Sequence, residues 1–516
     1  MTKRANFLTG AGILTVALFG AKIIGAFYRI PLTNILGSEG MGVYQLVFPI
    51  YSFLLSTSSG ALPVAISLLV SEKKAVGDDV GAKKILVSAM SVLMLWAVLI
   101  AMALVLLCKP LGSFQGNTDT YWGYLAIAPA IFFVSGIALL RGWFQGNGYM
   151  TPTAISQISE AVVKLCAGLT CAYFLAPYGI AYAVGGAMFG VTISEVVTFI
   201  ILYIMYRKNN SALKLNFNFK EAKDSYKSIV KISIPITIGG MILPLTQIID
   251  SVLVVNILSS SIGTALATSS YGIYSGYVAT IINLPIVLGL SLGIAVIPQI
   301  SKGKASHDIA EIKNNSDTVV KFSLIIGVPF MLIYALAARS ILTLLFPSLT
   351  ETELSEAIIL LQIGSFSVVG LSVTQIYTSI LQGVGATYSP TINMAIGALV
   401  KTVLNVVLLY YIGIYGVAVS SVVCYTLVAV LNISKHAKLL GKSKELVKNS
   451  GIILLAGVIM GVIIATIRYF AFSNLASVGA IILGGIIYIA ILLQGKVFNE
   501  RELKHMPFIA KLAIKR

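Results

Sequence analysis

A chain of 516 residues that is 57% hydrophobic and only 11% charged is too apolar for an ordinary soluble domain, and its composition indicates a polytopic membrane protein. The net charge of +17 would suggest a nucleic-acid partner in a soluble protein. Here most Lys and Arg residues lie in short loops between apolar segments, so the charge indicates membrane topology and we expect no nucleic-acid partner.

Fourteen apolar segments are long enough, at roughly 20 residues, to cross a bilayer. They lie at 8–35, 42–70, 85–108, 121–145, 152–175, 179–206, 229–258, 270–300, 319–345, 355–382, 389–410, 414–434, 449–470 and 475–495. If the N-terminus with Lys3 and Arg4 is cytoplasmic, the inner segments carry 29 of the 36 Lys and Arg residues. This bias predicts a multi-pass protein of the cell membrane with both termini in the cytoplasm. The first apolar run is too long for a signal peptide, so we expect a retained helix.

The first apolar segment carries two basic residues, Lys22 and Arg29. A charge at bilayer depth costs about 3 kcal/mol, so such residues usually face a protein interior or a water-filled cavity. Seven residues separate the two, which places both on one face of a helix. Pro31 removes a backbone donor and predicts a kink on the same face. The segment therefore predicts a basic cavity that binds an anion, with Lys22 and Arg29 as substrate-binding residues.

Five more charged residues lie inside later spans. Lys164 and Lys401 are expected to line the same cavity, although Glu160, four residues before Lys164, could instead pair with it along one helix. Glu195 either pairs with a cavity cation or binds a coupling cation. Asp250 is either a structural partner for the first-segment cations or one half of a gating salt bridge that forms in one conformational state.

Arg141 and four pairs of glycines are not expected to bind a substrate. Arg141, at the inner end of the fourth segment, is expected to serve topology or to contact lipid headgroups. Glycine pairs with GxxxG spacing predict close helix packing. These pairs are Gly142/Gly146, Gly186/Gly190, Gly289/Gly293 and Gly457/Gly461.

The chain contains an internal repeat. Gln145–Gly148 (QGNG) recurs as Gln382–Gly385 (QGVG), and Lys164 matches Lys401 at the same offset of 237 residues. The two repeats enter the membrane in the same direction, which predicts two pseudo-symmetric halves that enclose a central site and alternate its access.

This repeat sets the expected domain organisation, an all-α membrane protein of fourteen helices. The N-terminal six-helix lobe covers 1–206, and a cytoplasmic connection at 207–231 leads to the C-terminal six-helix lobe at 229–434. Residues 435–516 add two further transmembrane helices and a basic cytoplasmic tail.

Four segments of the chain carry a family resemblance: GAFYRIPLTNILG (Gly25–Gly37), YQLVFPIYSFLL (Tyr44–Leu55), ALPVAIS (Ala61–Ser67) and RGWFQGNGYMTPTAISQ (Arg141–Gln157). Together they resemble the stage V sporulation protein B family, which belongs to the multidrug/oligosaccharidyl-lipid/polysaccharide exporter superfamily and is related to MurJ-type lipid II flippases. The resemblance covers essentially the whole chain. The arginine-rich second helix of the MurJ-type group is absent from this sequence.

The resemblance implies two lobes around a V-shaped cavity and transfer of an undecaprenyl-pyrophosphate-linked peptidoglycan precursor, lipid II or a close relative, from the inner to the outer leaflet. Such a flippase would serve cell-wall or spore-cortex synthesis, with the lipid-linked glycan, membrane lipids and the cell-wall synthesis machinery as partners. The alternative within the superfamily is a drug/cation antiporter, which should present acidic residues to its substrates.

A membrane glycan polymerase or ligase is an alternative from another functional class. Such an enzyme would need catalytic carboxylates or histidines in an outer loop. Glu351, Glu353 and Glu356 form the densest acidic group there, and they have the character of a solvated loop. The three histidines lie in inner segments or the tail, and the four cysteines form no CxxC motif. We therefore expect a transporter and not an enzyme, without a catalytic residue, cofactor or metal site.

Overall fold

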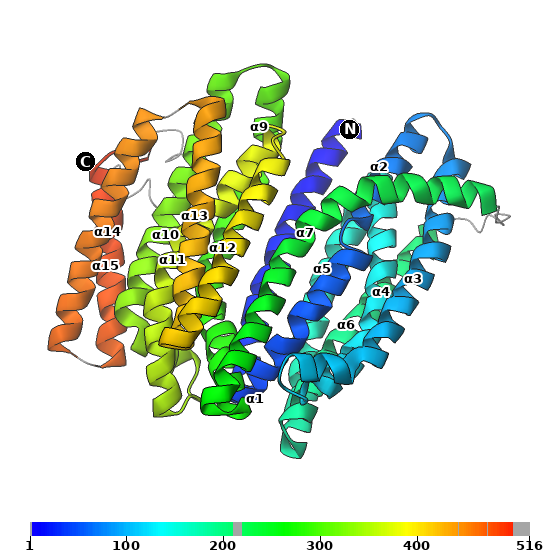
Figure 1. Cartoon of the computed structure of the whole chain (residues 1–516). Coiled ribbons are helices and arrows are strands. Elements are labelled where there is room, and N and C mark those ends of the chain that lie inside the picture. Colours follow the sequence, from blue (N-terminus) through cyan, green and yellow to red (C-terminus); the bar gives the residue numbers. More distant parts are fainter. Residues whose placement is uncertain (1–2, 210–218, 442, 472, 499–516) are drawn as a thin grey trace. The chain divides into compact units, whose positions relative to one another are not determined.

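The computed structural model describes residues 3–209, 219–441, 443–471 and 473–498, and every regular element within these ranges is a helix (Figure 1). The first part of the chain contains α1 (Lys3–Ser58), α2 (Leu62–Ala75), α3 (Asp79–Phe114), α4 (Thr120–Gly146), α5 (Thr151–Leu175), η1 (Ala176–Tyr178) and α6 (Ile180–Asn209). The middle contains α7 (Phe219–Ile262), α8 (Thr264–Gly272), η2 (Ile273–Val278) and α9 (Ala279–Ala305). The last part contains α10 (Ile309–Leu345), α11 (Glu351–Gly383), α12 (Tyr388–Ile412), α13 (Tyr415–Leu440), α14 (Lys444–Phe470) and α15 (Asn474–Gln494).

All fourteen predicted apolar segments are helical, which confirms an all-α, multi-pass membrane protein. Twelve helical segments among the described residues are long and apolar enough to span a membrane. One of them, Gly12–Ala75, has 64 residues and is long enough for two crossings. The predicted segment at 270–300 consists of the end of α8, the π-helix η2 and most of α9. Parts of the predicted connection at 207–231 and of the basic tail lie outside the described residues.

The first helix is broken at Gly37, whereas Pro31 lies within its continuous first part. Gly37 has φ 68° and ψ −177°, a conformation that essentially only glycine adopts. The helix continues through Pro31, and the hydroxyl of Thr33 donates to the carbonyl oxygen of Arg29 at 2.7 Å. Membrane helices tolerate proline in their interior. The break at Gly37 divides α1 into the first predicted span and the beginning of the second.

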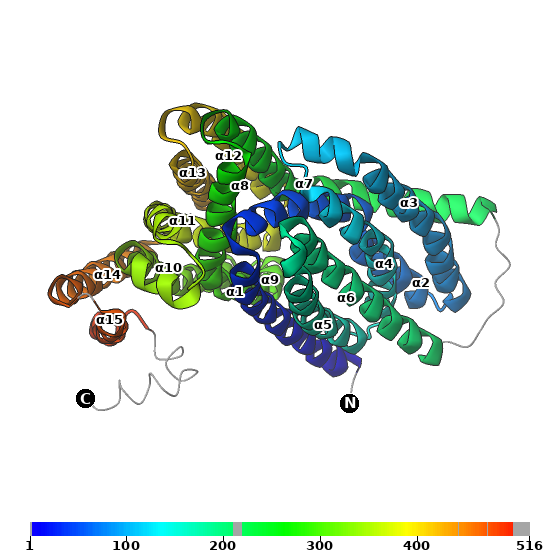
Figure 2. The same ribbon diagram turned by 90° about the horizontal axis from the view of Figure 1, so that it is seen from below.

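The chain divides into two compact units, each of which we describe separately. Unit 1 comprises Met1–Thr280 with Thr402–Val417, and unit 2 comprises Ile281–Lys401 with Ala418–Arg516. In unit 1, α6 packs against both α4 and α5, and α5 also packs against α1 (Figure 2). In unit 2, α10 packs against α11 and α14, and α14 pairs with α15.

Glycines allow close helix packing in unit 1, as the GxxxG spacing predicts. A Cβ atom added to Gly142 or Gly146 on α4 would lie 3.0 or 2.8 Å from a backbone carbonyl oxygen of α2. On α6, a Cβ at Gly190 would lie 2.3 Å from the Cα atom of Gly168 on α5. These helices therefore meet at backbone distance because no side chain separates them.

Loop residues fix where several helices begin. The side chain of Asp78 accepts a hydrogen bond from the backbone N–H of Gly81 at 2.7 Å and caps α3. Lys73 forms an ion pair with the same carboxylate at 3.2 Å. The Gly81 N–H and the Lys73 ammonium together hold the pKa of Asp78 below its usual value.

Buried contacts attach the last two helices to α10 within unit 2. Val328 on α10 shares an apolar core with Ile453 and Met460 on α14 and with Ala480 on α15. Lys321, which is almost fully buried, donates to the carbonyl oxygen of Val497 at 3.0 Å. The lysine therefore satisfies its ammonium group at a backbone oxygen that follows α15.

Gly37→Ala should destabilise the protein by about 1–3 kcal/mol, because alanine is strained at this φ and ψ. Thermal unfolding of the purified protein in detergent would show a lower midpoint. Gly479→Ala on α15 is the matched control, since Gly479 has a helical conformation with open space at the Cβ position. The control should unfold at or slightly above the wild-type midpoint. An unchanged midpoint for Gly37→Ala would contradict the assigned role of this glycine.

Candidate functional site

Two of the four predicted intramembrane cations lie on one aromatic ring in unit 1. The guanidinium carbon of Arg29 is 5.8 Å from the centroid of the Phe48 ring, and Nζ of Lys164 is 5.5 Å from the same centroid. Both distances fall in the range of cation–π attraction. Neither cation has a carboxylate within 4 Å among the described residues.

The break at Gly37 is what allows Arg29 and Phe48 to meet. Nineteen residues separate them, and a straight helix would place them about 28 Å apart at 1.5 Å per residue. Because the chain turns at Gly37, the second part of α1 returns beside the first. Lys164 reaches the same ring from α5, which packs against α1.

Aromatic residues flank Phe48 on α1. The ring of Tyr44 stacks on Phe48 at 5.7 Å between centroids, and Tyr51 follows at 6.2 Å. Their spacing of four and three residues places all three on one helix face. The hydroxyl of Tyr51 and that of Tyr28 are buried and have no hydrogen-bond partner among the described residues. A buried hydroxyl in that state costs about 1–3 kcal/mol, so two unsatisfied polar groups lie on this helix.

Arg141 on α4 has a partner that the sequence did not reveal. Its Nη2 atom lies 2.9 Å from Oε2 of Glu160 on α5, and its Nε donates to Oγ of Ser156 at 2.9 Å. The ion pair is partly buried, with side chains 16% and 30% exposed. Arg141 therefore joins two helices, which differs from the expected role in topology or headgroup contact. Since Glu160 is paired with Arg141, it does not neutralise Lys164 as the helical spacing allowed.

Glu195 on α6 completes a charged group, which we call the first-half cluster. Its side chain is only 4% exposed and has no hydrogen-bond or ion-pair partner in the part of the chain that the structure describes. It lies within electrostatic range of Glu160, Lys164 and Arg141. The first-half cluster consists of Arg29, Phe48, Arg141, Glu160, Lys164 and Glu195, and so contains three cations and two carboxylates.

The other predicted site residues lie elsewhere. Lys22 is exposed on α1, about two turns before Arg29. Asp250 on α7 is buried and accepts a hydrogen bond from Nδ2 of Asn405 on α12 at 2.6 Å, also within unit 1. Lys401 is a buried residue of α12 that belongs to unit 2. The structure thus brings Arg29, Lys164, Glu160 and Glu195 into one cluster.

Phe48, Tyr51 and the pairing of Arg141 were not predicted from the sequence. The spacing of Tyr44, Phe48 and Tyr51 was a usable signal, because these positions repeat on one helix face. Their contact with Arg29 was not predictable, since it depends on the break at Gly37.

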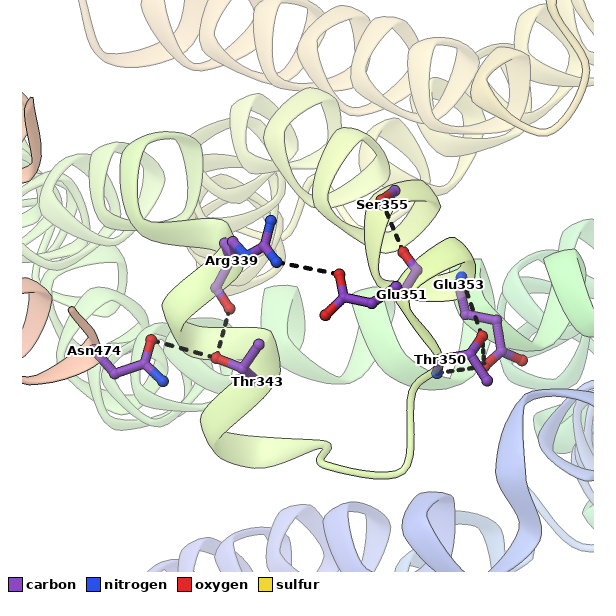
Figure 3. Close-up of polar contacts among 7 residues, drawn as sticks. All are labelled: Arg339, Thr343, Thr350, Glu351, Glu353, Ser355 and Asn474. Atoms are coloured by element: carbon purple, nitrogen blue, oxygen red, sulfur yellow. Dashed lines mark hydrogen bonds and ion pairs between the residues drawn. The ribbon is translucent and has the colours of Figure 1, made fainter. Parts of the chain in front are cut away.

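The carboxylates at the start of α11 have structural contacts. Oε2 of Glu351 lies 3.1 Å from Nη2 of Arg339, and Glu353 forms a capping box with Thr350 at the start of α11 (Figure 3). Thr343 also contacts Asn474 at 3.5 Å and so joins α10 to the start of α15. Across the described residues, no group of three or more His, Cys, Asp or Glu side chains is placed to hold a metal ion.

The structure therefore defines a multi-pass helical membrane protein with a charged cluster inside its first half. The chain belongs to the polysaccharide biosynthesis protein family, which matches residues 7–304. The MatE family matches residues 235–407.

Similarity to individual proteins extends over the full length and confirms the resemblance to the stage V sporulation protein B family. Stage V sporulation protein B of Bacillus subtilis (strain 168) is 28% identical over 524 residues, covering 99% of this chain and 100% of that protein. Lipid II flippase MurJ of the same organism is 25% identical over 488 residues, covering 90% of this chain and 89% of that protein. The solved structure of lipid II flippase MurJ in an inward closed conformation has a TM-score of 0.75 at 16% identity, covering 93% of this chain and 97% of that one. This structural likeness shows a common fold.

Glu160→Gln should destabilise the protein by roughly 1–3 kcal/mol, because it weakens the partly buried contact with Arg141. The midpoint of thermal unfolding in detergent would report the change. Glu351→Gln is the control, since its pair with Arg339 has side chains 58% and 80% exposed and should contribute little. Equal midpoints for the two variants would show that the Arg141–Glu160 pair does not stabilise the fold.

Proposed function

We propose that the protein is a flippase that moves an undecaprenyl-pyrophosphate-linked peptidoglycan precursor, lipid II or a close relative, from the inner to the outer leaflet. The observation that carries this proposal is the placement of Arg29 and Lys164 on the Phe48 ring without a carboxylate partner among the described residues. Cations at this depth in a membrane protein usually serve a substrate or ion pathway. The similarity to a lipid II flippase supports the same cargo class.

A pyrophosphate group suits these two cations. A guanidinium offers paired donors to phosphate oxygens, and an ammonium acts as a compact point charge. Binding of the anion would replace the weaker attraction of each cation to the Phe48 ring with a charge-assisted hydrogen bond. Lys22, exposed about two turns nearer the N-terminal end of α1, would attract the headgroup before it reaches Arg29. Lys401 is the ligand that we propose for the headgroup in the second half of the chain. The contact of Asp250 with Asn405 would change during the transport cycle.

The transport cycle would be alternating access between two pseudo-symmetric lobes, 1–206 and 229–434, with both termini in the cytoplasm. Exposed aromatic side chains at the C-terminal ends of α5, α12 and α14 are typical of a membrane interface, and the bias of Lys and Arg supports the orientation. They are Tyr173, Phe174, Tyr178, Tyr410, Tyr411, Tyr469 and Phe470. An inside-negative potential favours outward movement of an anionic headgroup by about 2.3 kcal/mol per charge at 100 mV.

A drug/cation antiporter is the second candidate, because the MatE family matches residues 235–407. The first-half cluster argues against it, since the three cations exceed the two carboxylates there. The two functions differ in a simple assay. Overexpression should confer no resistance to cationic drugs if the cargo is an anionic lipid, and resistance would favour the antiporter.

Depletion of the protein in its native cell should cause an undecaprenyl-linked precursor to accumulate in the inner leaflet. Arg29→Ala and Lys164→Ala should each fail to restore precursor export and growth, despite normal membrane insertion, because each removes a ligand of the pyrophosphate. Arg339→Ala is the control, as it removes an exposed cation outside the cluster and should restore both. Normal export by an Arg29→Ala/Lys164→Ala double variant would refute the site assignment.

A further inference from the structure

The internal repeat allows residues in and beside the first-half cluster to be compared with the residues at the matching positions of the second half. At the offset of 237 residues that relates Lys164 to Lys401, the repeat places Thr378 at the position of Arg141, Asn393 at that of Ser156 and Asn432 at that of Glu195. All three second-half residues lie in unit 2, on α11, α12 and α13. The two halves thus hold different chemistry at matching places in the repeat.

The second-half residues form a neutral hydrogen-bonded chain. Nδ2 of Asn393 donates to Oδ1 of Asn432 at 2.8 Å, and Nδ2 of Asn432 is 3.4 Å from Oγ1 of Thr378. Asn432 is fully buried. An amide therefore satisfies this position of the repeat without any charge, so helix packing alone does not require a carboxylate there.

The first half has the carboxylate of Glu195 where the second half has the amide of Asn432, and few neighbouring groups stabilise this carboxylate. Glu195 is buried without a hydrogen-bond or ion-pair partner among the described residues. Burial of an unpaired carboxylate is unfavourable, and such groups usually gain a proton or a partner. The groups that face it are Tyr51 on α1, Arg141 on α4, and Glu160 and Lys164 on α5. The Tyr51 hydroxyl is itself buried and without a partner in the described part of the chain.

We propose that Glu195 binds one proton when the anionic headgroup occupies the site and releases it when the headgroup leaves. In the empty site, burial and the neighbouring charge of Glu160 favour the protonated form of Glu195, and the positive charges of Lys164 and Arg141 oppose them by favouring the carboxylate. A pyrophosphate bound to Arg29 and Lys164 adds two negative charges nearby. The Lys164 ammonium then pairs with the phosphate and stabilises the Glu195 carboxylate less, so the ionised form of Glu195 is disfavoured. The proton comes from water, forms an O–H bond with a Glu195 carboxyl oxygen, and returns to water after release of the headgroup.

This inference rests on the proposed function and adds a proton to its cycle. One proton would accompany each headgroup, so the loaded site carries one negative charge fewer than the headgroup brings. Lipid transfer would then depend on pH as well as on the membrane potential. Glu195 acts here by changing its own charge, which a glutamine at the same position cannot do.

The test measures binding of a prenyl-pyrophosphate-N-acetylglucosamine probe to the purified full chain in nanodiscs. Both phosphates of this probe are esterified, so its charge is constant between pH 6 and 8. Uptake of one proton on binding makes the affinity fall by up to tenfold for each unit of pH increase. Wild-type protein should show this slope, whereas Glu195→Gln should bind with an affinity independent of pH. Glu351→Gln, outside the cluster, should keep the wild-type slope.

Calorimetry of wild-type protein in two buffers of different ionisation enthalpy provides a measurement that needs no variant. It should show uptake of up to one proton per bound probe. Zero uptake, or equal pH slopes for wild type and Glu195→Gln, would overturn the inference while leaving the proposed cargo in place. A wild-type protein that does not bind the probe would overturn both the inference and the proposed function.

Discussion

Positive charge held within an apolar helical domain is the constraint on which the described site depends. Arg29 on α1 and Lys164 on α5 share the Phe48 ring, which offers only weak attraction compared with a carboxylate. A protein that stored these charges for stability alone would pair them, as Arg141 and Glu160 are paired a short distance away. The unpaired state leaves both cations available to an incoming anion.

Local backbone geometry and long-range packing both contribute to this arrangement. The glycine conformation at Gly37 turns α1 back on itself and places Phe48 beside Arg29. Close packing of α5 against α1 and α6, helped by Gly168 and Gly190, brings Lys164 and Glu195 to the same region. The second half repeats the helices with amide and hydroxyl groups at the corresponding positions. Matching positions of a sequence repeat can thus hold charged side chains in one half and neutral, hydrogen-bonded ones in the other.

The sequence predicted the helical segments well, because hydropathy over about 20 residues reports directly on the cost of exposing polar groups to lipid. It also singled out Arg29, Lys164, Glu160 and Glu195, since charged residues are rare inside spans. It did not predict which of these charged side chains form ion pairs with one another. Glu160 lies four residues from Lys164 but pairs with Arg141, a choice made by the packing of α4 on α5. The break at Gly37 was not predicted either, because the backbone conformation of a glycine cannot be read from hydropathy or charge.

The most direct measurement is a cryo-electron microscopy structure of the full chain bound to a lipid-linked pyrophosphate precursor. Our account predicts density for the pyrophosphate within hydrogen-bond distance of both the Arg29 guanidinium and the Lys164 ammonium, with both cations moved from the Phe48 ring. Headgroup density elsewhere, with the two cations still on that ring, would contradict it.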